Sequence, residues 1–405
     1  MNIELNLDHI NEAYDALKPV VKHTPLVASK SFSEMAGCKI YLKLENLQAT
    51  GSFKIRGAYN RIRTIDDSEK AKGVVCASAG NHAQGVAYAA TRAGIKSTIF
   101  MPSFTPALKV IATKSYGGEI RLTGATFDEA NSAAREFERK SGALYVPPFD
   151  DERVIAGQGT IALEIFQDLK NIDAILVPIG GGGLISGIAY AVKAMNPGVK
   201  VYGVEAEGAA AMKFSVDSGE IKPFENIHTI ADGIAVKNPG LKTFEVIKNY
   251  VDGIVTVSDD EIALTVYHLL QRAKNLVEPA GAVGLAAAFN RKLDLEGKNV
   301  VCIISGGNIR MDLLQQIIEK SLLDSGLRIR MELIIPDVPG KLNEIVSVLN
   351  ELRANIFEID HDRSASKVPV GYVRVTISFH VQQDNQVKAI KTEFKKRNLQ
   401  YKMLK

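Results

Sequence analysis

The stretch AILVPIGGGGLISGIAY, residues 174–190, predicts the fold class of the chain. An apolar run is followed by four successive glycines and a second apolar segment, which is the order expected of a strand, a glycine loop and a helix. The stretch carries no charge, as a membrane span would, but Pro178 and the glycines would break a helix exposed to lipid. We therefore expect a buried strand and a loop, and no membrane partner.

The same alternation continues from residue 1 to about residue 320. Short apolar runs predict strands at residues 73–78, 97–102, 174–179, 201–206 and 299–305. These runs show little alternation of apolar and polar residues, which is typical of parallel sheets with helices on both faces. The fold class is therefore α/β, with open, mainly parallel sheets. Because ligands bind beyond the carboxyl ends of such strands, the loops starting at Ser78, Gly180 and Ser305 are expected to share one crevice.

The pattern changes after about residue 321. A first strand, RIRMELIIP, is followed by a helix at 341–353, strands at 355–361 and 370–380, a helix at 384–396 and a last short strand. This βαββαβ order predicts a ferredoxin-like domain. We place a short polar linker at residues 323–327, between a larger domain of residues 1–322 and a small domain of residues 328–405.

The composition is that of a globular protein with more than one domain. A chain of 405 residues exceeds the size at which single cores stop growing. The 46% hydrophobic and 23% charged residues are ordinary shares for such a protein. The 49 basic and 46 acidic residues leave a net charge of +3, and no basic stripe is interleaved with aromatic residues. We therefore expect no nucleic acid partner.

The cysteines and the N-terminus indicate a reducing compartment. Cys38, Cys76 and Cys302 are odd in number and far apart, which argues against both a disulfide framework and a zinc site. The first residues, MNIELNLDHINEAYDAL, carry acids and a helical pattern where a signal peptide would show a basic start and an apolar run. We expect a cytoplasmic protein.

Lys54 is the candidate nucleophile, in the segment SFKIRGA at residues 52–58. Thr50, Gly51 and Ser52 form a typical helix start, so the amine of Lys54 would lie near the positive end of a helix, which lowers its pKa. An amine that is less protonated condenses more readily with an aldehyde. Lys54 is therefore suited to hold an aldehyde cofactor.

The segment SAGNHAQG, residues 78–85, follows an apolar run and opens an alanine-rich helix. Free backbone N–H groups at such a helix start can receive a carboxylate, so a small anionic substrate is expected. Asn81 is either a helix cap or a ligand contact, and the sequence leaves both open. His82 is better suited to a structural role than to a catalytic one.

Gly180, Gly181, Gly182 and Gly183 lie between a predicted strand and a predicted helix, where backbone amides can close around a phosphate. No GK[ST] sequence follows, as a Walker loop requires, and Ile185 or Ser186 occupies the third glycine position of a dinucleotide fingerprint. A tight turn without a ligand is the alternative. It does not require four glycines, which cost backbone entropy.

Ser305, in SGGN at residues 305–308, ends the last apolar run of the larger domain. Its hydroxyl could bond a ring nitrogen, although a plain Ser-Gly-Gly turn is the alternative. An amine, a carboxylate cradle, a phosphate cradle and a hydroxyl on strand-end loops together suit an aldehyde that carries a phosphate and a pyridine ring. The predicted cofactor is pyridoxal 5'-phosphate.

The motifs SFKIRGA, SAGNHAQG, GGGGL and SGGN, in this order, resemble the threonine dehydratases of the tryptophan-synthase-β class of pyridoxal-phosphate enzymes. The resemblance spans about residues 5–320 and implies a two-subdomain fold-type II core, whose smaller subdomain occupies roughly residues 45–150. By this resemblance Lys54 would form the Schiff base, Phe53 would pack on the ring, Asn81 would bond the ring hydroxyl, Gly180 to Gly183 and Leu184 would hold the phosphate, and Ser305 would meet the pyridine nitrogen. Ser78, Ala79, Gly80, Asn81 and His82 would take the substrate carboxylate, and Glu278 would lie near the site.

The activity that the resemblance implies is a β-elimination. A neutral hydroxyl opposite the pyridine nitrogen makes the ring a weaker electron sink than an aspartate would, which favours loss of a β-substituent. L-Threonine would give 2-oxobutanoate and ammonia, and L-serine, as a secondary substrate, would give pyruvate. Serine racemases carry a second serine where this chain has Ala79, and cysteine synthases usually show a loop closer to SGNTG. Of the racemases' acidic cation site only Glu205 and Glu207 remain here, with Ala211 unable to ligate through its side chain, so we expect no metal.

The turn DVPGKL at residues 337–342 resembles the ligand turn of ACT domains, which bind small amino acids. The residues of that motif are Asp337, Pro339, Gly340 and Leu342, and an ordinary Pro-Gly turn is the alternative. The resemblance implies an enzyme whose ACT domain, residues 328–405, regulates it, with isoleucine as the expected effector and valine or AMP as rivals. An amino-acid sensor without turnover is a second hypothesis. We expect a homodimer or a homotetramer.

Overall fold

The computed structural model describes residues 4–382 and 384–404 and divides the chain into two compact units, one up to Arg310 and one from Met311. The second unit begins with helix α13 (Met311–Asp324), whereas the sequence suggested a division after residue 322. The reason is that the α/β patterning of the sequence changes only after this helix. The predicted linker thus includes the last two residues of α13, and strand β11 begins at Arg328 as expected.

The larger sheet of the first unit has, among the described residues, six strands in the order β1-β2-β10-β7-β8-β9. They are β1 (Leu26–Ser29), β2 (Lys39–Lys43), β10 (Asn299–Ile303), β7 (Ala174–Pro178), β8 (Lys200–Ala206) and β9 (Gly253–Val257). Neighbouring strands are parallel except β1 and β2. Every residue of β7 is buried, which explains why the sequence shows an apolar run there without alternation.

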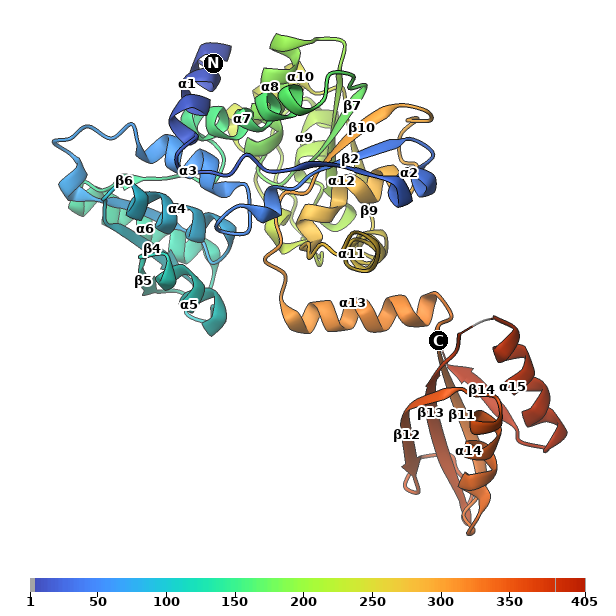
Figure 1. The fold of residues 1–405 in the computed structure, drawn as a ribbon. Helices are drawn as coiled ribbons and strands as arrows, with labels where there is room; N and C mark the ends of the chain where they lie inside the picture. Colours follow the sequence, from blue (N-terminus) through green and yellow to red (C-terminus); the bar gives the residue numbers. More distant parts are fainter. Residues whose placement is uncertain (1–3, 383, 405) are drawn as a thin grey trace. The chain divides into compact units, whose positions relative to one another are not determined.

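The smaller sheet has four parallel strands among the described residues, in the order β5-β4-β3-β6. They are β5 (Glu119–Leu122), β4 (Ser97–Met101), β3 (Val74–Ala77) and β6 (Leu144–Tyr145). Cys76 and Ile99 share a core cluster with helix α4 (Asn81–Arg92), while the alternate residues Val75 and Phe100 share one with α6 (Phe127–Ser141). Helices therefore cover both faces of this sheet (Figure 1).

Further helices of the first unit surround the two sheets (Figure 1). They are α1 (Leu7–Leu17), α2 (Lys30–Ala36), α3 (Lys54–Ile62), α5 (Ala107–Ser115), α7 (Glu152–Asp168), α8 (Gly183–Met195), α9 (Ala211–Ser218), α10 (Leu241–Tyr250), α11 (Asp259–Ala273) and α12 (Pro279–Phe289). Helix α12 has buried residues on all sides, as a core helix should. Within the described residues, none of the helices combines the length and the apolar character needed to cross a bilayer.

The second unit contains an antiparallel sheet in the order β12-β13-β11-β14 and two further helices. Its elements are β11 (Arg328–Pro336), α14 (Lys341–Glu351), β12 (Asn355–Asp362), β13 (Tyr372–His380), α15 (Asp384–Lys396) and β14 (Tyr401–Leu404). Met331, Val375 and Phe379 from the strands pack with Phe394 from α15 in one apolar core. The predicted ferredoxin-like βαββαβ order is confirmed.

Candidate active site

Lys54 is the first residue of α3. Its Nζ donates a hydrogen bond to the carbonyl oxygen of Pro148 at 2.8 Å and lies 5.2 Å from the centroid of the Phe53 ring. Burial lowers the pKa of Lys54 to about 8, although the carboxyl of Glu278 acts in the opposite direction. An appreciable fraction of this amine is therefore neutral and nucleophilic just above neutral pH.

Helix α4 runs close beside Lys54 because Gly85 has no side chain. A Cβ added at Gly85 would lie 3.1 Å from the carbonyl carbon of Lys54 and 3.3 Å from its Cβ. The glycine thus permits the start of α4, with Asn81, to lie near the start of α3.

Asn81 is held at both ends of its amide. Its Nδ2 donates to Oε1 of Glu278 at 2.6 Å, and its Oδ1 accepts from Nδ2 of Asn308 at 2.7 Å. Asn308 also donates to the carbonyl oxygen of Thr50 at 2.9 Å. The interpretation of Asn81 as a helix cap is wrong, because Gly80 occupies the cap position and Asn81 is the first residue of α4.

Glu278 is the carboxyl group of the site and is only 5% exposed. Burial raises the pKa of Glu278 to about 7, although its hydrogen bond from Asn81 acts to lower it. A Cβ added at Gly306 would lie 2.1 Å from Oε1 of Glu278. Gly306 is therefore required for this carboxyl to reach Asn81, a role that the sequence analysis did not assign to it.

The loop after β3 has backbone N–H groups and open space at Gly80. The N–H of Gly80 donates to the hydroxyl of Ser78 at 3.2 Å, and a Cβ added at Gly80 would meet no atom within 4 Å. His82 lies below the loop, where its Nε2 is 2.9 Å from the carbonyl oxygen of Val146. Burial lowers the pKa of His82 to about 3, so the imidazole is neutral and supports the loop. Ala79 carries no group that could transfer a proton.

The glycine loop after β7 presents buried amides at the start of α8. Gly181, Gly182 and Gly183 are buried, and their N–H groups have no acceptor in the described part of the chain. Gly182 has a φ of +94°, which favours glycine. Buried N–H groups are rarely left without a partner, and at a helix start they suit an anion. The loop therefore fits the predicted phosphate.

The side chains of Thr243 and Phe149 contact the glycine loop and fix its position. The hydroxyl of Thr243 donates to the carbonyl oxygen of Gly181 at 2.7 Å. The ring of Phe149 packs against the same glycine, since a Cβ added there would lie 2.2 Å from a ring carbon. The predicted neighbour Leu184 is buried in the first turn of α8. Sequence reasoning missed Thr243 and Phe149.

Ser305 follows β10 and is 3% exposed. Its carbonyl oxygen accepts from the N–H of Phe53 at 3.1 Å, and Gly306 pairs with Ser52 in an isolated bridge. The loop of Ser305 and the loop of Lys54 are thus joined by backbone hydrogen bonds. The buried hydroxyls of Thr50 and Ser52 have no hydrogen-bond partner among the described residues.

The segment from Val146 to Asp150 connects these loops, and sequence reasoning missed it. The carbonyl oxygens of Val146 and Pro148 accept from His82 and Lys54, as described above. The carboxylate of Asp150 accepts from the N–H groups at the start of α10, with distances from 2.9 to 3.2 Å. The only local signal was the sequence PPFD after an apolar run.

The carboxyl group of Glu205 accepts hydrogen bonds from the first turn of helix α9. Its two carboxylate oxygens accept from the N–H groups of Met212 and Lys213 at 2.9 and 2.7 Å. Burial raises the pKa of Glu205 to about 8. Among the described residues, no group of three or more His, Cys, Asp and Glu side chains is arranged to hold a metal.

The chain is similar to proteins of one family. Residues 17–306 match the family described as "Pyridoxal-phosphate dependent enzyme". A protein of Thermotoga maritima named "L-threonine ammonia-lyase" is 48% identical over 95% of this chain and 96% of its own length. The processed form of threonine deaminase isoform 2 from Solanum lycopersicum has a TM-score of 0.75 at 40% identity, over 77% of this chain and 92% of that chain. Serine racemase from Dictyostelium discoideum has a TM-score of 0.72 at 38% identity, over 76% and 99%.

Proposed function

Because the chain belongs to the family of pyridoxal-phosphate dependent enzymes, within the group that includes the L-threonine ammonia-lyases, we propose that it dehydrates and deaminates L-threonine to 2-oxobutanoate and ammonia. The observation that carries the proposal is the half-buried amine of Lys54, with its pKa lowered to about 8, in a site whose glycine loop leaves buried N–H groups free. An amine and an anion cradle in one site are what a phosphorylated aldehyde requires.

Pyridoxal phosphate fits the residues present. Lys54 would hold its aldehyde, Gly180 to Gly183 and Leu184 its phosphate, Asn81 its ring hydroxyl and Ser305 its pyridine nitrogen, with Phe53 beside the ring. When bound, the cofactor withdraws electrons from the Cα of the amino acid.

The substrate carboxylate would be bound by N–H groups of the loop from Ser78 to His82, where Gly80 leaves open space. When it is not bonded to the cofactor, the amine of Lys54 would take the proton from Cα. That proton and the hydroxide that leaves Cβ together make one water molecule, and a water molecule then hydrolyses the released enamine to 2-oxobutanoate and ammonia. The Asn81 amide, fixed by Glu278 and Asn308, keeps its orientation during these steps.

The test is a threonine turnover assay on the purified protein loaded with pyridoxal phosphate. We expect 2-oxobutanoate to form, and Lys54→Ala to abolish both turnover and the absorbance of the lysine-bound cofactor. Lys70→Ala, in an exposed position, is the matched control and should leave both unchanged. Threonine binding without 2-oxobutanoate, in a protein without the absorbance, would favour the amino-acid sensor instead.

An activity on serine is the second candidate function. Its two forms are elimination and racemisation, and Ala79 discriminates between them. Serine elimination to pyruvate uses the same groups as threonine elimination, so we propose it as a slower reaction. Racemisation requires an acid on the opposite face of Cα, where the resembling racemases carry a serine and this chain has Ala79. Pyruvate without D-serine is the expected product from L-serine, and D-serine as the main product would contradict the assignment.

We also propose that the C-terminal domain of residues 328–405 regulates the reaction. The Thermotoga relative covers 95% of this chain, and therefore most of this domain. In the turn before α14, Gly340 has a φ of +93° and Asp337 accepts two hydrogen bonds from Arg363, at 2.6 and 3.0 Å. With Pro339 and Leu342, this turn is the proposed effector site, with isoleucine as the first effector to test and valine and AMP as rivals.

Turnover with and without isoleucine, valine and AMP tests this regulation. A chain that lacks residues 328–405 should keep its activity and lose the response. Full isoleucine sensitivity in the shortened chain would contradict the assignment of the domain. The oligomeric state, a dimer or a tetramer by our proposal, can be measured on the same samples by light scattering.

A further inference from the structure

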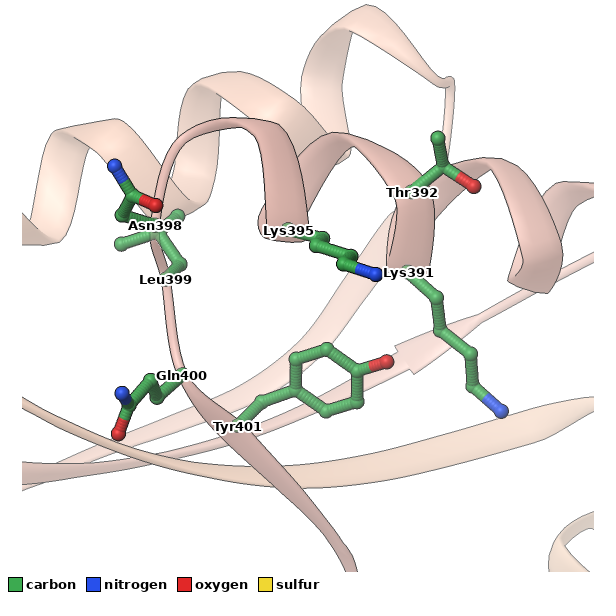
Figure 2. Close-up of a pocket in the computed structure, with 7 residues that line it drawn as sticks. All are labelled: Lys391, Thr392, Lys395, Asn398, Leu399, Gln400 and Tyr401. Atoms are coloured by element: carbon green, nitrogen blue, oxygen red, sulfur yellow. The ribbon is translucent and has the colours of Figure 1, made fainter.

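A groove of about 650 Å³ lies between α15 and β14 of the second unit (Figure 2). It is lined by Lys391, Thr392, Lys395, Asn398, Leu399, Gln400 and Tyr401. Figure 2 shows the amino groups of Lys391 and Lys395 and the hydroxyl of Tyr401 on one side, with Asn398 and Gln400 on the other. The volume is within the usual range for a small-molecule site.

The charge of the groove is positive and unbalanced. Residues 384–404, from the start of α15 to the end of β14, hold five lysines and one arginine against two acids, Asp384 and Glu393. Glu393 is engaged by Lys396 and Arg397, each at 3.2 Å. Among the described residues, Lys391 and Lys395 have no acidic partner in the ion pairs of the second unit. Two ammonium groups one helical turn apart thus face the same groove without a carboxylate.

The uncharged residues of the groove are mostly polar, and one of them is fixed by the core. The ring of Tyr401 packs against Phe394 of the core, with a centroid distance of 5.8 Å and an interplanar angle of 61°. Its position is therefore fixed by a side chain that is itself buried. The amides of Asn398 and Gln400 can donate and accept hydrogen bonds at the edge of the same groove.

We propose that this groove binds a small phosphate-bearing metabolite as a second ligand of the C-terminal domain. Lys391 and Lys395 would hold the phosphate as point charges, and the hydroxyl of Tyr401 would donate to it. The groove does not suit a free amino acid, because no lining residue carries a carboxylate that could form an ion pair with its ammonium group. It is therefore chemically distinct from the turn of Asp337, which carries a carboxylate.

The test is calorimetric titration of the full-length protein, loaded with pyridoxal phosphate so that the glycine loop is filled, at constant ionic strength and without threonine. The probes are inorganic pyrophosphate and AMP, with L-isoleucine, a zwitterion without a phosphate, as the comparison. The double variant Lys391→Ala and Lys395→Ala should lose about tenfold or more in affinity for both phosphate probes. Lys388→Ala, an exposed lysine of the same helix outside the groove, should not.

The two phosphate probes separate the possible sources of the ligand. Tighter binding of AMP than of pyrophosphate would support a nucleotide, with its base on the Tyr401 ring, and equal or weaker binding of AMP would support a smaller phosphate compound. The proposal is overturned if neither probe gives saturable binding at millimolar concentration, or if the double variant binds both as tightly as the parent. Because no turnover is measured, this outcome is independent of the proposed reaction.

Discussion

Replacing Arg56 with methionine should be among the most damaging single changes outside the residues that touch substrate or cofactor. Arg56 is fully buried in α3, two residues after Lys54. Its guanidinium donates from Nε and Nη2 to the carboxylate of Glu45, both at 2.8 Å, and its Nη1 lies 2.7 Å from Oε1 of Glu164. Lys43, also fully buried, lies 2.6 Å from the other oxygen of Glu164. Two cations and two anions thus form one buried network.

The structure indicates which carboxylate the substitution deprives of its directly paired cation. Glu164 keeps Lys43, but Glu45 keeps only neutral partners within hydrogen-bonding distance, such as Thr24 and Gln48. Although burial raises the pKa of Glu45, the charge and hydrogen bonds of Arg56, together with smaller contributions from Lys43 and Thr24, hold the pKa below its ordinary value. Removing one partner of a buried ion pair costs about 3–5 kcal/mol. That is a large share of the ~5–15 kcal/mol by which a typical domain is stable.

The measurement is urea unfolding followed by far-ultraviolet circular dichroism, because the chain has no tryptophan for fluorescence. Arg63→Met is the matched control at the end of the same helix, since its partner Glu12 has a side chain 63% exposed and the pair is worth about 0–1 kcal/mol. Arg56→Met should also bind pyridoxal phosphate more weakly, because helix α3, which carries Lys54, loses its ion pairs with Glu45 and Glu164. A loss of stability for Arg56→Met no larger than that for Arg63→Met would refute the reasoning.

Three further predictions concern the site itself. Gly306→Ala should lower the free energy of unfolding by about 1–3 kcal/mol, because the new Cβ would lie 2.1 Å from Oε1 of Glu278. The control is Gly80→Ala, where the added Cβ has open space. In the same urea measurement, this control should change the free energy of unfolding by less than about 0.5 kcal/mol. Thr243→Val removes the hydrogen bond to the glycine loop and should weaken cofactor binding by about tenfold in equilibrium dialysis; unchanged binding would show that the loop needs no support. The rate at which added pyridoxal phosphate attaches to cofactor-free protein should increase with pH, because only the neutral amine of Lys54 reacts. The midpoint of this pH dependence should lie at about 8, the pKa of Lys54. Ionised Glu278 raises that pKa, so Glu278→Gln should move the midpoint to lower pH, and a midpoint that stays in place would contradict the coupling.

The strands that the sequence predicted are those with the strongest burial. Strand β7 was expected at residues 174–179 and extends over Ala174–Pro178, and β4 was expected at 97–102 and extends over Ser97–Met101. Among the described residues, five strands of the first unit were not predicted: β1, β2, β5, β6 and β9. Most residues of β5 are exposed, and β6 has two residues. Such strands leave no apolar run, so local pattern could not reveal them.

The loops of the site were predictable from the order of strands, but their contacts were not. The hydrogen bond from Lys54 to Pro148 spans 94 positions in the sequence, the one between Asn81 and Glu278 spans 197, and the one between Asn81 and Asn308 spans 227. A sequence pattern reports what a residue prefers within its own turn or strand. It contains no information about which of many distant carbonyls or carboxyls will be adjacent.

The glycines of α3, α7 and α8 make the same point for the framework behind the site. Helix α7 packs against both α3, which carries Lys54, and α8, which follows the glycine loop. A Cβ added at Gly157 of α7 would lie 2.7 Å from the Cα of Gly57 in α3, and one added at Gly187 of α8 would lie 2.5 Å from the backbone nitrogen of Gly159 in α7. Local propensity counts each of these glycines as a weak point in a helix. Their packing instead fixes the separation of the Lys54 helix and the glycine loop, so residues that are unfavourable locally are required by the geometry of the site.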